Sequence, residues 1–103
     1  MADGARAPAE GPSRGDIWLA DLGPTRGHER AGVRPSLVIS TDLFNRGPDR
    51  LVVVLPLRTT RPETPLHVGV YLPEGGLRQV SYVQCEDVRS ISTERLIQRW
   101  GSV

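Results

Sequence analysis

The sequence predicts a small antiparallel β-barrel. Short segments of alternating or continuous apolar residues recur along the chain, glycine and proline turn signals separate them, and little of the chain shows helical periodicity. With 103 residues, the chain has room for one domain with a small core. Its single cysteine, Cys85, excludes an intramolecular disulfide.

The folded domain is expected to cover residues 14–103. Residues 1–13 are rich in Ala, Gly and Pro and contain no apolar run, so we expect a disordered tail and not a signal peptide. No segment approaches the roughly twenty apolar residues that a membrane-spanning helix needs. Together with the lone cysteine, this predicts a soluble, cytoplasmic protein.

Residues 14–40 are the stretch around which the rest of the chain is organised. Alternating apolar side chains predict a first strand over residues 16–22, in which Trp18 is expected in the core or an interface more than as a base-stacking platform. A second, buried strand is expected at residues 37–39, entered through Pro35. The glycine-rich loop between them, residues 23–32, is long for a hairpin, and such loops are usually functional or mobile.

The remaining elements continue the β pattern. Residues 51–57 are the most β-prone segment, and Pro56 predicts that this strand lies at an edge or bulges there. Helical turns are expected at residues 42–45 and, with a capping serine, at residues 92–95. Further strands are expected at residues 66–72, 80–84, 88–91 and 98–103.

Charge is distributed unevenly along the chain. Residues 26–61 contain seven arginines and three acidic residues, a net charge of +4, whereas residues 62–103 carry a net charge of −1. All thirteen Lys and Arg positions hold arginine. A coding bias explains this at least as well as a functional requirement does. The planar guanidinium nevertheless suits phosphate, so the middle of the chain is compatible with an anionic partner.

Motifs for metal or cofactor binding are absent from the sequence. There is no Walker loop, no dinucleotide-binding glycine motif, no CxxC pair and no HExxH, so we expect neither a metal nor a cofactor. Of the two histidines, His67 lies in an alternating strand segment and is expected to be structural. His28 lies in the glycine-rich loop beside Glu29 and is the better titratable candidate.

Several segments of the chain resemble a known family. RGDIW at residues 14–18, PTRGHE at 24–29, GVRP at 32–35 and LVIS at 37–40 resemble the N-terminal signature of the MazF/PemK (Kid) toxins of type II toxin-antitoxin operons. Residues 53–60 are similar to the third strand of that family, and residues 86–91 to its late "DQVRSI"-like element. The resemblance spans about residues 14–103.

This resemblance implies an SH3-like barrel that forms a homodimer, cleaves single-stranded RNA at short sequences without a metal, and is inhibited by a MazE-like antitoxin. The family uses the 2′-hydroxyl of the RNA as nucleophile and leaves a 2′,3′-cyclic phosphate and a 5′-hydroxyl. Arg34 matches the principal catalytic arginine of the family, with an ion pair to Asp16 or Glu29 as the structural alternative. Glu29 matches the loop glutamate that accepts the 2′-hydroxyl proton, and His28 is its rival.

The second catalytic residue of the family is a threonine at the end of the third strand. Counting from Pro56 places Arg58 at this position, but we favour Thr59, reached through a one-residue bulge, because its hydroxyl can bond a phosphate oxygen. The residues expected to bind RNA around these groups are Arg26, His28, Arg30, Arg58, Thr60 and Arg61.

Two points of the resemblance leave alternatives open. CcdB-like toxins share this fold but bind DNA gyrase and cleave nothing, and a basic barrel can also serve as a plain nucleic-acid-binding module. Relatives continue past residues 100–103 into an amphipathic helix that helps to shape the dimer. The 103 residues of this sequence end before such a helix would begin, so the resemblance does not specify the dimer geometry.

Overall fold

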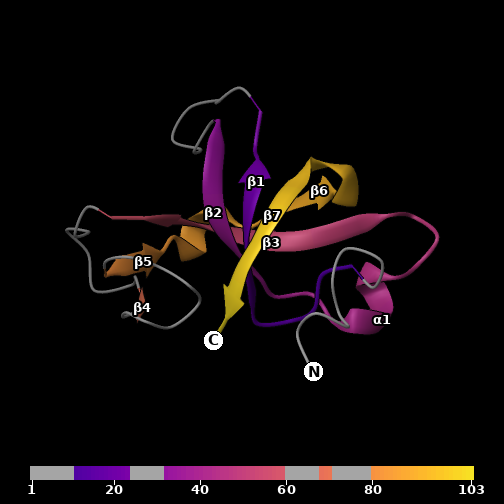
Figure 1. Ribbon diagram of the computed structural model, residues 1–103, viewed down its shortest axis with the longest axis horizontal. Coiled ribbons are helices and arrows are strands. Elements are labelled where there is room, and N and C mark those ends of the chain that lie inside the picture. Colours follow the sequence, from indigo (N-terminus) through magenta and orange to yellow (C-terminus); the bar gives the residue numbers. More distant parts are fainter. Residues whose placement is uncertain (1–10, 24–31, 60–67, 71–79) are drawn as a thin grey trace.

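The computed structural model describes residues 11–23, 32–59, 68–70 and 80–103. Seven strands form one sheet in which every pairing is antiparallel (Figure 1). The strands are β1 (Asp16–Asp21), β2 (Val33–Val38), β3 (Leu51–Arg58), β4 (Val68–Val70), β5 (Ser81–Val83), β6 (Arg89–Ser92) and β7 (Leu96–Ser102). Three helical turns accompany them: α1 (Asp42–Asn45), η4 (Cys85–Asp87) and η5 (Thr93–Arg95).

The order of the strands is β4-β5-β3-β2-β1-β7, and β6 pairs with β3 beside this path. β7 lies across the front of the sheet and pairs with β1 (Figure 1). The predicted mainly β, antiparallel fold with short helical turns is therefore confirmed. Among the described strands, however, β4 and β7 end the path without pairing to each other, so this sheet is not closed into a barrel.

β1 is buried on both of its faces. Trp18, Ala20 and Leu22 join an apolar cluster that includes Val38, Val52, Val54 and Ile91, while Ile17 packs on the opposite face with Leu57 and Val83. Alternation along a strand sends successive side chains to opposite faces, so one short strand contributes to both clusters. The prediction that Trp18 belongs to the core is confirmed, since the residue is 6% exposed.

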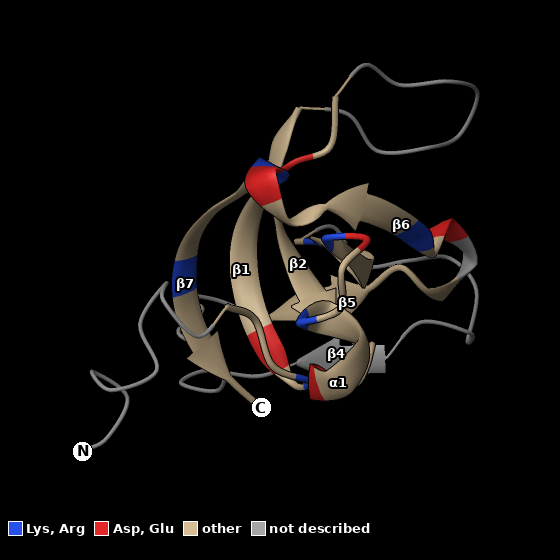
Figure 2. Ribbon diagram, turned by 90° about the vertical axis from the view of Figure 1, so that its right-hand side faces the viewer, with Lys and Arg blue, Asp and Glu red and all other residues tan. Residues whose placement is uncertain are grey.

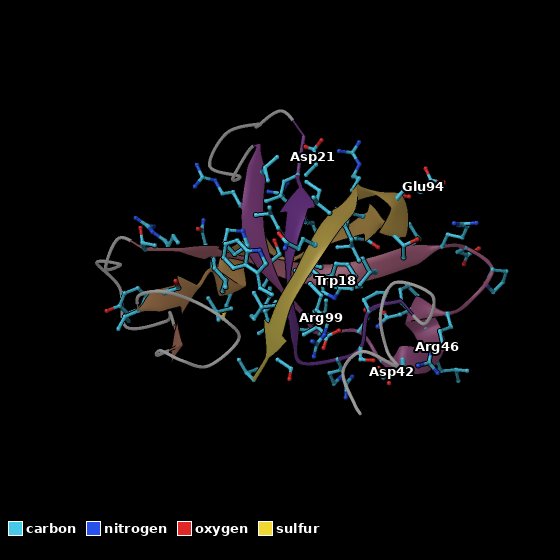
Figure 3. All side chains as sticks on the ribbon, in the orientation of Figure 1. Trp18, Asp21, Asp42, Arg46, Glu94 and Arg99 are labelled. Carbon is cyan, nitrogen blue, oxygen red and sulfur yellow. The ribbon has the colours of Figure 1, made fainter. Side chains whose placement is uncertain are left out.

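A buried carboxylate fixes the start of β1. Asp16 is 1% exposed, and its Oδ2 accepts hydrogen bonds from the backbone N–H of Ser13 at 2.9 Å and from Trp18 Nε1 at 3.1 Å. Its Oδ1 lies 3.4 Å from Arg99 Nε on β7. Trp18 and Arg99 lie close together beside β7 (Figure 3). A carboxylate removed from water needs such compensation, and here it joins β1 to β7.

The prediction that Pro56 marks an edge strand is wrong. β3 is a central strand, and Pro56 lies within it, paired with Ser36. On the other side, the partner of β3 changes from β6, which ends at the pair Val54↔Arg89, to β5, which begins at Leu57↔Val83. The Pro56 carbonyl accepts from the Gln84 N–H at 2.9 Å on this side. The missing N–H faces the same side, because a strand residue directs both groups one way.

The helical turns form at the two predicted places, and a side chain caps the start of each. The Thr41 side chain accepts from the Phe44 N–H at the start of α1, and the Ser92 side chain accepts from the Glu94 N–H at the start of η5. β2 begins earlier than predicted and includes Pro35, which pairs with Leu19. Within the described ranges, no helix is long and apolar enough to span a membrane.

Candidate functional site

Three of the predicted site residues lie in the described part of the chain: Arg34 in β2, Arg58 at the end of β3, and Thr59 directly after it. The other six fall outside the described residues, namely Arg26, His28, Glu29, Arg30, Thr60 and Arg61. The geometry of the site is therefore built from β2, β3 and the residues that border the 24–31 loop.

The two ends of this loop are held together. The Leu22 N–H donates to the Gly32 carbonyl and the Gly32 N–H donates to the Gly23 carbonyl, each at 2.9 Å. Gly23 and Gly32 have φ of +77° and +76°, a left-handed conformation that favours glycine. We call Leu22, Gly23 and Gly32 the stem of the loop. The stem fixes where the chain enters β2, because Gly32 lies two residues before Arg34.

Arg34 and Arg58 lie on one face of the sheet. The pairing between β2 and β3 ends at Ser36↔Pro56, and each arginine lies two residues beyond this pair, so alternation returns its side chain to the face of Ser36 and Pro56. Beyond the pair the strands separate, as β2 continues along β1 (Ala20↔Arg34) and β3 along β5 (Arg58↔Tyr82) (Figure 1). The two arginines thus stand on either side of the point where β2 and β3 part.

The environment of Arg58 favours an anionic ligand. The residue is half-buried, and its buried Nε has no hydrogen-bond partner among the described residues. Buried N–H groups are nearly always satisfied by protein, water or ligand. Thr59 is exposed and lies in a bend just after β3, so the ladder does not fix the side to which its hydroxyl points.

Sequence reasoning missed an ion pair on this same face, where Arg89 pairs with Val54 of β3. Arg89 Nη2 donates to both carboxylate oxygens of Asp87, at 2.8 and 2.9 Å, and the Asp87 side chain is only 5% exposed. Arg89 Nη1 also donates to the Leu22 carbonyl at 3.4 Å, at the stem of the loop. The available signal was the acid-x-arginine spacing within residues 86–91, which does not by itself distinguish a buried pair from two exposed charges.

A second arginine reaches the same stem from η5. Arg95 Nη1 donates to the Asp21 carbonyl at 3.4 Å, and the Asp21 carboxylate accepts from the Gly23 N–H at 2.9 Å. The charged segments of η5 and of the end of β1 lie side by side (Figure 2). The stem therefore receives guanidinium donors from both sides, because the carbonyls of Asp21 and Leu22 are consecutive in an extended chain.

A hollow of about 650 Å³ lies elsewhere, beside α1, and its lining includes Trp18, Arg46 and Glu94 (Figure 3). It contains neither Arg34 nor Arg58, and Glu94 offsets part of its positive charge. Within the described segments, no three His, Cys, Asp or Glu side chains are grouped as metal ligands. The arginines at the parting of β2 and β3 remain the better candidate site for an anion.

The fold and this face define a class: a small antiparallel β protein that presents arginines where two central strands separate. Comparison with known proteins makes the class specific. Residues 13–103 match the family described as PemK-like, MazF-like toxin of type II toxin-antitoxin system. The chain belongs to this family, and the resemblance predicted from the sequence is confirmed.

Individual relatives agree with this assignment. The chain is 36% identical over 87 residues to Endoribonuclease EndoA of Bacillus subtilis (strain 168), which covers 84% of this chain and 75% of EndoA. The structure is similar to MazF (Form-I) from Deinococcus radiodurans, with a TM-score of 0.76, 25% identity and coverage of 89% and 81% of the two chains. It is also similar to an endoribonuclease in complex with its cognate antitoxin from a mycobacterial species, with a TM-score of 0.67, 26% identity and coverage of 89% and 76%.

Proposed function

We propose that this protein is the endoribonuclease toxin of a type II toxin-antitoxin pair and that it cleaves single-stranded RNA at short sequences without a metal. The family and the similarity to EndoA support the enzyme class. The observation that carries the proposal is the position of Arg34 and Arg58 on one face, beside the stem of the 24–31 loop. A phosphate seated at this point meets positive charge from two strands.

The proposed reaction is an internal transesterification. The 2′-oxygen attacks the adjacent phosphorus, the bond from phosphorus to the 5′-oxygen breaks, and the products are a 2′,3′-cyclic phosphate and a 5′-hydroxyl. The reaction needs a base near the 2′-hydroxyl, stabilisation of a dianionic phosphorane and a proton for the leaving oxygen. Arg34 supplies fixed positive charge to the phosphorane, because a guanidinium stays protonated and cannot serve as the base.

The remaining roles follow the sequence-based assignment. Glu29 accepts the 2′-hydroxyl proton, with His28 as the alternative base. Thr59 donates its hydroxyl to a phosphate oxygen, and Arg58 beside it adds charge. Arg26, Arg30, Thr60 and Arg61 bind the RNA backbone on either side of the cleaved bond.

We further propose that the toxin acts in the cytoplasm as a homodimer and that a MazE-like antitoxin silences it. A solved relative is described as bound to its cognate antitoxin, and another as MazE-MazF from Deinococcus radiodurans, which supports an antitoxin partner for this chain. The competing function is that of a toxin that binds DNA gyrase without cleaving nucleic acid.

The test is cleavage of a single-stranded transcript by the purified protein in EDTA, with the new ends analysed chemically. We expect cyclic phosphate and 5′-hydroxyl ends that disappear in Arg34→Ala and persist in Arg46→Ala, a matched change at an exposed arginine just after α1. If wild-type protein cleaves no RNA and Arg34→Ala remains as toxic as wild type on expression, the enzyme proposal fails and the gyrase alternative gains support.

A further inference from the structure

Tyr82 is the middle one of three residues that pair side by side across β3, β5 and β4, the part of the sheet that we call its wing. It pairs with Arg58 of β3 on one side and with Gly69 of β4 on the other. Directly paired residues of antiparallel strands project from the same face, so Tyr82 and Arg58 share one face of the sheet. Gly69 has no side chain, and the ring therefore has no neighbour in the row on that side.

The core does not account for this aromatic ring. The row behind it, Leu57↔Val83, points to the opposite face, where both residues are at most 3% exposed and form an apolar cluster. Tyr82 belongs to neither apolar cluster of the described chain and is half-buried. A ring left partly open on the face of Arg34 and Arg58 is available to a ligand.

The pairing of this ring with Arg58 matches what unpaired nucleotides require. Proteins bind single-stranded RNA by combining positive charge for the backbone with aromatic side chains on which bases stack. Cross-strand neighbours hold their Cβ atoms about 5 Å apart, so one nucleotide can have its phosphate at Arg58 and its base on Tyr82. The buried Nε of Arg58, without a partner among the described residues, is a further group that such a phosphate satisfies.

We propose that Tyr82 is a base-stacking residue of the RNA site and receives an unpaired base next to the phosphate bound by Arg58. This inference rests on the proposed ribonuclease function and adds a base subsite to it. Because every base has a π-face, the subsite contributes mainly affinity, with a modest preference for bases that stack well. It also directs the strand away from Arg34 along β3 and β5.

The test uses substitutions that distinguish the contribution of the aromatic ring from those of side-chain volume and of the hydroxyl. Tyr82→Leu keeps an apolar side chain without a stacking ring, and Tyr82→Phe keeps the ring without the hydroxyl. Phe44→Leu is the matched control, because Phe44 is 42% exposed on α1, at the opposite end of the long axis from β4 and β5 (Figure 1).

Binding is measured by fluorescence anisotropy with a labelled RNA of about 12 nucleotides that carries the mapped cleavage site, with 2′-deoxyribose at the cleaved nucleotide. We expect Tyr82→Leu to raise Kd about tenfold, and Tyr82→Phe and Phe44→Leu to stay within about twofold of wild type. In cleavage assays, Tyr82→Leu is expected to raise KM and leave kcat nearly unchanged, a division that a general loss of folded protein does not produce.

Several results would overturn the inference. If Tyr82→Leu binds RNA with the Kd of wild type, there is no base subsite at Tyr82. If Tyr82→Phe weakens RNA binding as much as Tyr82→Leu does, the effect belongs to the hydroxyl and not to the ring. If thermal unfolding shows that Tyr82→Leu is not folded, Tyr82→Trp replaces it in the test. RNA affinity that Tyr82→Trp retains supports base stacking, and lost RNA affinity refutes it. Weakened antitoxin binding with unchanged RNA binding also refutes it.

Failure of the proposed function is seen separately, in wild-type protein that cleaves no RNA. In that case the Tyr82 subsite is judged with a random-sequence, single-stranded RNA pool of about the same length. Tighter binding of this pool by wild type than by Tyr82→Leu still supports the subsite, and equal binding refutes it.

Discussion

Arginines meet different surroundings in two regions of this molecule. Where β1 meets β7, Arg99 lies beside the buried carboxylate of Asp16, and on β6 Arg89 binds both oxygens of Asp87. Where β2 and β3 separate, Arg34 and Arg58 occupy one face, and Arg58 forms no ion pair with a described residue. We infer that the first group of arginines serves the fold and the second serves a ligand.

The largest expected effect is that of Arg34→Ala on cleavage. Removing one preorganised group that stabilises charge in a transition state typically lowers kcat by about 100- to 1,000-fold. Arg34 is half-buried and not part of either apolar cluster, so we expect little change in the urea midpoint of unfolding. Single-turnover cleavage and urea unfolding of the same preparation check both statements, and a large loss of stability with normal activity per folded molecule would break the comparison.

Asp16→Asn should lower stability and leave activity unchanged, the opposite of what we expect for Arg34→Ala. It leaves the largely buried Arg99 without its counter-charge, and breaking such a pair is expected to lower the free energy of unfolding by roughly 3 kcal/mol. Asp49→Asn, at an exposed position, is the control and should change it by less than about 0.5 kcal/mol. Activity per folded molecule should be unaffected. A loss of activity at full stability would place Asp16 in the site and not in the scaffold.

Thr59→Ala and Arg58→Ala sharpen the comparison within the site. If the Thr59 hydroxyl bonds a phosphate oxygen, its removal should lower kcat by about 10- to 100-fold, the usual range for a hydrogen bond to a charged group. Arg58→Ala should act mainly through KM, because its charge contributes to binding. Full activity of Thr59→Ala combined with a loss of kcat in Arg58→Ala would reverse the assignment.

Gly23→Ala should have the smallest effect. Alanine at φ +77° costs about 1–2 kcal/mol of stability, and the new Cβ would lie 3.0 Å from Arg95 Nη1 and displace it from the stem. Gly11→Ala is the matched control, since Gly11 has φ of +73° and no heavy atom within 4 Å of the added Cβ. The difference between the two variants in urea unfolding measures the Arg95 contact, and equal destabilisation would show that this contact contributes nothing.

Much of the fold follows from local patterns. Alternation predicts β1, a β-prone run predicts β3, a short segment before a glycine-proline turn predicts α1, and a capping serine predicts η5, because each of these signals lies within a few consecutive residues. β2 begins at Val33, earlier than predicted, because the strand continues through Pro35, which pairs with Leu19 of β1. The open path of the sheet depends on which strands meet, and local patterns carry no such information.

The candidate site was predictable only in part. Arg34 and the basic exit of β3 were found through a family resemblance, which the family match now supports. Tyr82 was not found, because its position beside Arg58 depends on a pairing between residues 24 positions apart in the chain. The role of Asp87 also required the structure, since burial distinguishes its ion pair with Arg89 from a surface contact.

The proline in the middle of β3 has a consequence for the shape of the site. Position 56 has no amide hydrogen on the side where β6 gives way to β5, so no neighbouring strand can form a continuous ladder past it. The sheet is thereby divided into two wings that share one strand. The hydrogen bond from the Gln84 N–H to the Pro56 carbonyl is then the backbone link between β3 and the end of β5 at this position, and it limits how far the wing of β4 and β5 can tilt relative to β1 and β2.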